Sequence, residues 1–190
     1  MNRPASVGPD GPVRLFCALT LSDDVLDRLV EWQARLPAGD FRLVPRENLH
    51  VTLAFLGSRP VSEIDAICGE LRAAARASGR IVLHARRYRE TRSVGMVVFD
   101  DDGAAATALA ADLHSRLRRL GVYEPERRPW LPHLTAVRFR QRPRLDPAPP
   151  ELEAVSPSGA AVYHSVLRPT GAQYVVLHSF PLNPSRDVGG

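Results

Sequence analysis

The feature that most limits the possible folds of this chain is a tripeptide pattern, His-x-Thr, which occurs twice inside strand-like apolar runs. The two copies are His50-Val51-Thr52 and His133-Leu134-Thr135. Side chains alternate between the two faces of a β-strand, so the histidine and threonine of each copy point to one face and the apolar residue between them points to the other. The pattern therefore predicts two strands that each bury one face in a core and leave an imidazole and a hydroxyl on the opposite face.

If the two strands lie close together, a single cleft holds two imidazoles and two hydroxyls. One neutral and one protonated imidazole can act as a base and an acid near neutral pH. The hydroxyls can donate hydrogen bonds to negatively charged oxygens. These groups are sufficient for cleavage of a phosphodiester without a metal ion. We therefore take His50 and His133 as candidate catalytic residues, and Thr52 and Thr135 as candidate phosphate-binding residues.

The two motifs and their flanks resemble the 2H phosphoesterase superfamily, and within it the bacterial RNA 2',3'-cyclic phosphodiesterases, historically called 2'-5' RNA ligases. The flanking segments that carry the resemblance are residues 14–19, 45–49, 55–57, 127–132, 174–177 and 179–182. The resemblance runs from about residue 13 to residue 182. A single His-x-Thr would be a weak signal, whereas two copies with these flanks are a specific one.

The resemblance implies an α+β fold with two pseudo-symmetric lobes, in which antiparallel sheets form a central cleft and helices pack outside. It implies one bilobal domain over residues 13–182, preceded by a disordered segment, residues 1–12, and followed by a flexible tail, residues 183–190. Hydrophobic periodicity by itself predicts only α+β. It predicts helices near residues 23–36, 62–77 and 104–120, and strands near residues 13–20, 50–57, 81–89 and 94–99.

Two further expectations concern residues near the motifs. Alternation from His50 places Phe55 on the opposite face, in the core. Residues 141–150 are rich in proline and arginine, so they cannot form the interior of a helix. Relatives often carry a helix after the second motif, and this departure leaves the shape of the cleft rim on that side open.

The resemblance also implies a division of roles between the histidines. It implies that His50 donates a proton to the departing 3' oxygen, that His133 takes a proton from the attacking water, and that the product is a 2'-phosphate. The residues themselves give no reason to prefer this assignment over the reverse. Tyr163, Tyr174 and Trp130 are candidates for stacking on a nucleobase, with ordinary packing as the alternative.

Arg138 lies five residues after His133, where relatives carry an arginine that contacts phosphate. A guanidinium suits this role because it is always charged and can bind two oxygens at once. Strict alternation, however, places Arg138 on the face opposite His133. The resemblance therefore predicts a phosphate contact for Arg138, and the strand geometry allows it only if the strand bulges between the two residues.

Composition excludes several kinds of chemistry. All 25 basic residues are arginine, so the chain has no lysine for a P-loop, for a Schiff base or for a covalent adenylate. The His-x-Thr motif has no second ligand at metal spacing, so we expect neither a metal nor another cofactor. A net charge of +4 favours a polyanionic partner.

We expect the partner to be an RNA or oligonucleotide end with a 2',3'-cyclic phosphate, and we expect a monomeric, cytoplasmic protein without a membrane segment. Two alternatives remain. The same mechanism could act on 2'-5' linked oligonucleotides or on small molecules such as cyclic nucleotides and ADP-ribose cyclic phosphate. A protein of another class, an RNA-end binding module without turnover, would be expected to have lost one histidine.

Overall fold

The computed structural model describes residues 11–126, 128–168 and 171–182 of the chain. In these residues three α-helices, two short 3-10 helices and eight strands alternate. The strands are β1 (Val13–Thr20), β2 (Arg42–Leu43), β3 (Val51–Arg59), β4 (Val82–Glu90), β5 (Val94–Asp102), β6 (His133–Arg138), β7 (Gly159–Arg168) and β8 (Gly171–Pro181). The helices are α1 (Asp23–Ala34), α2 (Ile64–Ala77), α3 (Ala105–Arg119), η1 (Arg46–Asn48) and η2 (Val61–Glu63).

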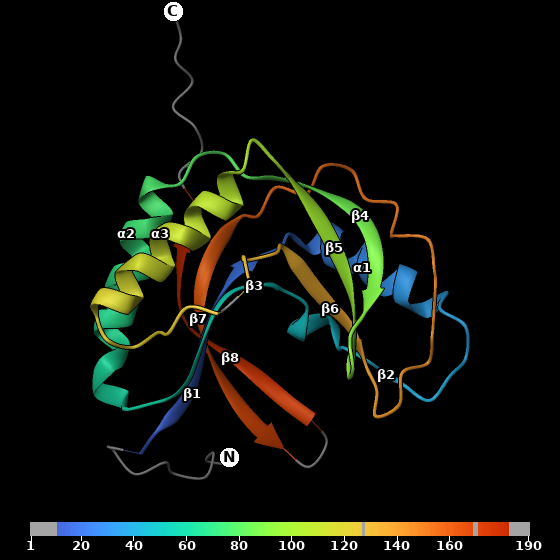
Figure 1. Cartoon of the computed structure of the whole chain (residues 1–190), viewed down its shortest axis with the longest axis horizontal. Coiled ribbons are helices and arrows are strands. Elements are labelled where there is room, and N and C mark those ends of the chain that lie inside the picture. Colours follow the sequence, from blue (N-terminus) through green and yellow to red (C-terminus); the bar gives the residue numbers. More distant parts are fainter. Residues whose placement is uncertain (1–10, 127, 169–170, 183–190) are drawn as a thin grey trace, which may run out of the picture.

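The strands form one curled antiparallel sheet in the order β4-β5-β6-β3-β1-β7-β8, and β2 pairs with β6 (Figure 1). Helices α2 and α3 lie side by side over one part of this sheet, and α1 lies over the β4–β6 part (Figure 1). The expected α+β class, antiparallel pairing and outer helices are confirmed. The two expected sheets are continuous with each other, because the halves of the molecule join where β3 meets β6.

The helices follow the apolar spacing of the sequence. The inner stripe of α2 includes Ile67, Cys68 and Leu71, and that of α3 includes Leu109 and Leu113; all are buried. Helix α3 ends before Gly121, whose φ of 79° lies in the left-handed region that favours glycine. Strand β7 was not predicted from the sequence. Among the described residues, no helix has both the length and the apolar character needed to cross a membrane.

The prediction that Phe55 belongs to the core is wrong, because its side chain is 60% exposed. The pairing of β3 with β1 skips Leu53 and Leu56, so β3 contains two irregularities. Leu53 is an extra residue, so the alternation shifts by one position after it. Phe55, and not Ala54, then points to the face that His50 and Thr52 occupy. Phe55 therefore lies opposite Phe16 of β1, with the two ring centres 6.0 Å apart.

The proline-rich segment after β6 contains no helix, as expected. The buried carboxylate of Glu90 anchors this segment to the sheet, accepting hydrogen bonds from the guanidinium of Arg142 at 2.9 Å and from the backbone N–H of Leu145 at 2.8 Å. The indole of Trp32 in α1 donates to the carbonyl of Ala148 at 2.9 Å. The segment thus runs along α1 and β4. The expectations for residues 1–10 and 183–190 lie outside the described residues.

Candidate functional site

The two motif strands meet at one paired position, where Val51 of β3 lies opposite Leu134 of β6. Both side chains are fully buried in the core. Because the strands are antiparallel, extending this register by one residue places His50 opposite Thr135, and Thr52 opposite His133. Residues directly opposite one another have Cβ atoms roughly 5 Å apart. The fold therefore brings the four predicted side chains together on the face opposite the core.

The two histidines are held in the same way. The Nδ1 atom of His50 lies 2.8 Å from the carbonyl oxygen of Asn48, and the Nδ1 atom of His133 lies 2.8 Å from the carbonyl oxygen of Leu131. A carbonyl oxygen can only accept, so each Nδ1 carries the proton. The Nε2 atom of each ring is then the one available to exchange a proton with a substrate. Each half of the molecule thus supplies one histidine in the same tautomer.

Aromatic side chains surround the His50 ring. The centre of the Phe16 ring lies 4.8 Å from it, that of Tyr163 lies 5.9 Å from it, and that of Tyr174 lies 5.4 Å from it, edge-on. The two tyrosines proposed to stack on a nucleobase therefore pack around this histidine. Among the described residues, no comparable aromatic pair includes His133.

This environment changes the acidity of His50. Its pKa falls from 6.5 to about 4, chiefly because burial disfavours the charged imidazolium. The hydrogen bond to the carbonyl of Asn48 opposes this shift, and the positive charges of Arg138 and a protonated His133 add to it. In the free protein at neutral pH, the His50 ring is therefore neutral. These contributions to the pKa of His50 also indicate that Arg138 and His133 lie near it.

Trp130, which precedes the second motif, also contacts the first motif. Its indole N–H donates a hydrogen bond to the backbone carbonyl of Thr52 at 3.0 Å. Trp130, Phe55, Thr52 and His133 all line one open cavity of about 600 Å³. This cavity adjoins the two motifs and presents apolar and aromatic surface beside them.

The bulge that Arg138 requires is present in β6. Met96 of β5 lies opposite Thr135 and Gly95 lies opposite Val137, so Ala136 is an extra residue in β6. Ala136 and Val137 are both fully buried, and the alternation resumes with Arg138 exposed on the side of His133 and Thr135. The objection from strict alternation therefore does not apply to this strand.

A hydrogen-bonded cluster supports the bulge. The carbonyl oxygen of Ala136 accepts a hydrogen bond from the backbone N–H of Val44 at 2.8 Å and one from the side-chain amide of Gln33 at 2.7 Å. The same amide donates to the carbonyl of Val44 at 3.1 Å, and Gln33 is only 3% exposed. Sequence reasoning missed Gln33, because one glutamine in an amphipathic helix gives no signal of a contact 103 residues away.

Phe16 was also missed as a residue of the site. Alternation along the strand at residues 13–20 would have found it, because the neighbouring Leu15 and Cys17 lie in the main core while Phe16 lies on the other face. In the described part of the chain, no group of three or more histidine, cysteine, aspartate or glutamate side chains is arranged to bind a metal ion.

Known proteins are similar to this chain in sequence and in fold. Residues 19–90 match the family described as LigT like Phosphoesterase. A Thermus thermophilus protein named RNA 2',3'-cyclic phosphodiesterase is 33% identical over 180 residues, which cover 90% of each chain. The crystal structure of Escherichia coli LigT in its apo form superimposes with a TM-score of 0.78 at 25% identity, covering 91% of this chain and 99% of that one.

Another crystal structure of Escherichia coli LigT contains 3'-AMP. It superimposes with a TM-score of 0.75 at 25% identity, covering 90% of this chain and 99% of that one. The identity to the Thermus protein over nearly the whole length and the common fold agree with the resemblance that the two motifs suggested. The chain belongs to the LigT-like family of 2H phosphoesterases and is an enzyme of that family.

Proposed function

We propose that this protein hydrolyses the 2',3'-cyclic phosphate at the end of an RNA chain to a 2'-phosphate, without a metal ion. The observation that carries the proposal is the pairing of the two motifs at Val51 and Leu134, a register that sets each histidine opposite the threonine of the other strand when it is extended by one residue. A phosphate between the strands would meet two imidazole Nε2 atoms and two hydroxyls. The name of the Thermus thermophilus relative supports the substrate class.

In the proposed reaction, water attacks the phosphorus atom while the bond from phosphorus to the 3' oxygen breaks. His133 takes the proton that the water loses, and His50 donates a proton to the departing 3' oxygen. Each proton transfer is typically worth about 100- to 10,000-fold in rate. The hydroxyls of Thr52 and Thr135 donate hydrogen bonds to the non-bridging oxygens, and Arg138 offsets their charge.

The lowered pKa of His50 places a condition on this assignment. A general acid must carry its proton when the bond breaks, but His50 of the free protein is neutral at neutral pH. A bound phosphodiester carries a negative charge, which would raise the pKa of the ring and offset the effect of Arg138. His50 would then gain its proton together with the substrate.

The reverse assignment, in which His50 is the base and His133 the acid, is favoured by the neutral state of His50 in the free protein. A substrate with an aryl leaving group separates the two assignments, because such a group departs without needing a proton. The variant that lacks the acid should then recover most of its lost activity, and the variant that lacks the base should not. Recovery by His50→Ala supports the assignment proposed here, and recovery by His133→Ala supports the reverse.

The activity itself is tested with a short oligoribonucleotide that ends in a 2',3'-cyclic phosphate. We expect conversion to a 2'-phosphate, identified by comparison with authentic 2'- and 3'-phosphate products, and we expect the same rate in the presence of EDTA. A 3'-phosphate product would contradict the proposed bond cleavage. Loss of activity on chelation, with recovery on addition of metal, would contradict the metal-independent mechanism. Binding without turnover would favour the RNA-end binding module.

A further inference from the structure

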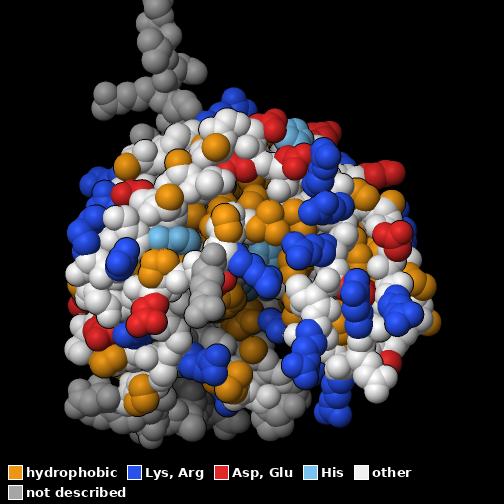
Figure 2. All heavy atoms as spheres, in the orientation of Figure 1, with side chains coloured by type: hydrophobic (Ala, Val, Ile, Leu, Met, Phe, Trp, Pro, Cys, Tyr) orange, Lys and Arg blue, Asp and Glu red, His pale blue; other side chains and the backbone are white. Residues whose placement is uncertain are grey.

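We propose that three arginines at the β2–β6 edge, Arg138, Arg42 and Arg140, form a track that binds the RNA backbone on the 5' side of the cyclic phosphate. This inference rests on the proposed function and deepens it, since it assigns the enzyme a preference for an oligonucleotide over a mononucleotide. Figure 2 shows a hollow on one face of the molecule, with hydrophobic and histidine side chains inside it and arginine side chains along one flank.

Two adjoining cavities mark the path of the track. The first, of about 430 Å³, lies beside the catalytic site, because its lining includes Tyr174, which packs against His50, and Arg138. The second, of about 540 Å³, is lined by Asp40, Phe41 and Arg140. Arg42 and Arg138 line both cavities, so the two are continuous across this pair. A chain that leaves the catalytic site through the first cavity meets Arg138 and Arg42, and then Arg140.

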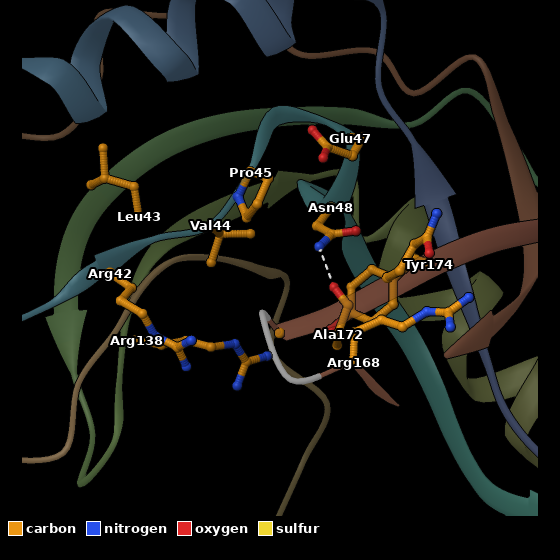
Figure 3. A pocket seen from close by; sticks show the side chains of 12 residues that line it. Arg42, Leu43, Val44, Pro45, Glu47, Asn48, Arg138, Arg168, Ala172 and Tyr174 are labelled. Atoms are coloured by element: carbon orange, nitrogen blue, oxygen red, sulfur yellow. Dashed lines mark hydrogen bonds between the residues drawn. The ribbon is translucent and has the colours of Figure 1, made fainter. Parts of the chain in front are cut away.

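The strands place two of these side chains together, and the chain that follows β6 adds the third. Arg42 of β2 is paired directly with Arg138 of β6, and Figure 3 shows both side chains extending along the same side of the first cavity. Strand β6 ends at Arg138, and exposure then alternates through the buried Phe139 to Arg140. Arg140 lines the second cavity together with Arg42 and Arg138, so it continues the row beyond this pair.

Charge repulsion within the track is set by the direct pairing of Arg42 with Arg138. Salt bridges among the described residues involve five arginines, Arg46, Arg59, Arg86, Arg116 and Arg142, and other exposed arginines such as Arg118 resemble the track in lacking one. No salt bridge among the described residues includes Arg42, Arg138 or Arg140. Like charges directly opposite each other on paired strands are destabilising. The Arg42–Arg138 pair would be relieved by an anion bound between the two guanidinium groups.

The nature of the anion follows from the same features. The cavities also contain two carboxylates, Asp40 and Glu47, but the guanidinium groups of the track, together with that of Arg168 in the first cavity, outnumber them. A single phosphate at the catalytic site would engage only Arg138. Arg42 and Arg140 lie farther along the path, and a ligand that reaches them must carry additional phosphates in a row. An RNA strand has this chemistry, because it carries one charge per nucleotide.

The test compares two substrates, a nucleoside 2',3'-cyclic phosphate and an eight-nucleotide RNA that ends in a 2',3'-cyclic phosphate. For Arg42→Ala and Arg140→Ala, we expect the ratio of kcat/KM for the RNA to kcat/KM for the mononucleotide to fall about fivefold. Each replacement should also reduce the slope of log(kcat/KM) against log[salt] for the RNA by about 0.7, the value for one contact to a single strand. Arg42→Lys retains the charge and should recover much of the ratio.

The matched control is Arg118→Ala, which removes an exposed charge from α3, a helix on the opposite side of the molecule from β2 in Figure 1. An unchanged ratio and salt slope in Arg42→Ala and Arg140→Ala would overturn the proposal, as would an equal change in Arg118→Ala. If the unmodified enzyme converts neither substrate, the proposed function fails and the track is tested by binding instead. Fluorescence anisotropy with a labelled eight-nucleotide RNA bearing a 3'-phosphate should then show weaker binding for Arg42→Ala. Equal binding would overturn the track.

Discussion

The two His-x-Thr strands are alike in their backbone and different in their surroundings. In both, the histidine Nδ1 is bonded to the carbonyl oxygen two residues earlier, at 2.8 Å. The first histidine, however, lies among Phe16, Tyr163 and Tyr174, whereas His133 belongs to a more open cavity. Repetition of the motif thus fixes the geometry of both rings, and the strands beside the first motif lower the pKa of His50.

This difference provides a physical basis for two roles from one motif. An acid and a base must differ in protonation at the moment of reaction, and identical environments would give them identical titrations. Burial lowers the pKa of His50 without changing the motif. Under the proposed mechanism, the aromatic residues of β1, β7 and β8 would contribute to the chemistry by lowering the pKa of the histidine that they contact.

The largest expected effect is the loss of either histidine. His50→Ala and His133→Ala should each reduce kcat/KM on a cyclic-phosphate RNA end by about 100- to 10,000-fold, because one proton transfer then falls to water. The double variant should lose little more than the worse single variant, since the two groups act as a unit. Steady-state kinetics with all three variants measures this. Near-normal kcat in His50→Ala would show that only the second motif is catalytic.

A second prediction compares the threonines. Thr52→Val and Thr135→Val each keep the shape of the side chain and remove one hydroxyl, which should cost roughly 1–3 kcal/mol of transition-state stabilisation. Thr52 is 9% exposed and Thr135 is half-buried. Hydrogen bonds are stronger where water is excluded, so we expect the larger loss of kcat from Thr52→Val. A larger loss from Thr135→Val would mean that the phosphate lies nearer the second strand.

A third prediction concerns stability and pH. The pKa of His50 is lowered in the folded protein, so the unfolded chain binds more protons between pH 6.5 and about 4. Stability should therefore fall as the pH drops through this window and level off below it. Urea unfolding at about pH 7 and about pH 4.5 should show an additional loss of about 2 kcal/mol for the natural protein relative to His50→Gln. Equal losses in the two proteins would indicate that His50 is more hydrated than its packing suggests.

The smallest expected effect comes from the support of the bulge. Gln33→Leu removes the amide that donates to the carbonyl of Ala136, and should misplace Arg138 without touching substrate. We expect a several-fold increase in KM with a smaller change in kcat, similar to Arg138→Ala. Combining the two replacements should add little to either, which a purely structural role for Gln33 would not predict. Additive effects on KM would show that Gln33 does not act through the contact between Arg138 and the phosphate.

Much of this architecture follows from local sequence patterns. Alternation around the two motifs predicts the common face of His50 and Thr52, and helical spacing predicts α1, α2 and α3. These features are set by residues close together in the chain, so a single sequence contains the necessary information. Their catalytic roles stay predictions until the variants are measured.

Strict alternation along a strand fails where strands bulge. Phe55 changes face because β3 contains irregularities opposite β1. Arg138 reaches the catalytic face through the bulge at Ala136, which contacts a glutamine from α1. A bulge depends on partners that are distant in sequence, so alternation along one strand does not reveal it. Glu90, which anchors the proline-rich segment, gives no signal for the same reason.

The single paired position between β3 and β6 also has a mechanical consequence. On either side of it the strands pair over several residues, so each half of the sheet is stiffer than the junction between them. The two histidines belong to different halves, and the distance between them therefore depends on the angle at this junction. A phosphate bound by both histidines would link the two halves of the sheet beside the junction, where only one pair of residues joins β3 to β6. Substrate binding would thus restrict changes in the angle between the two halves, and with them changes in the width of the cleft. Product release would remove this restriction.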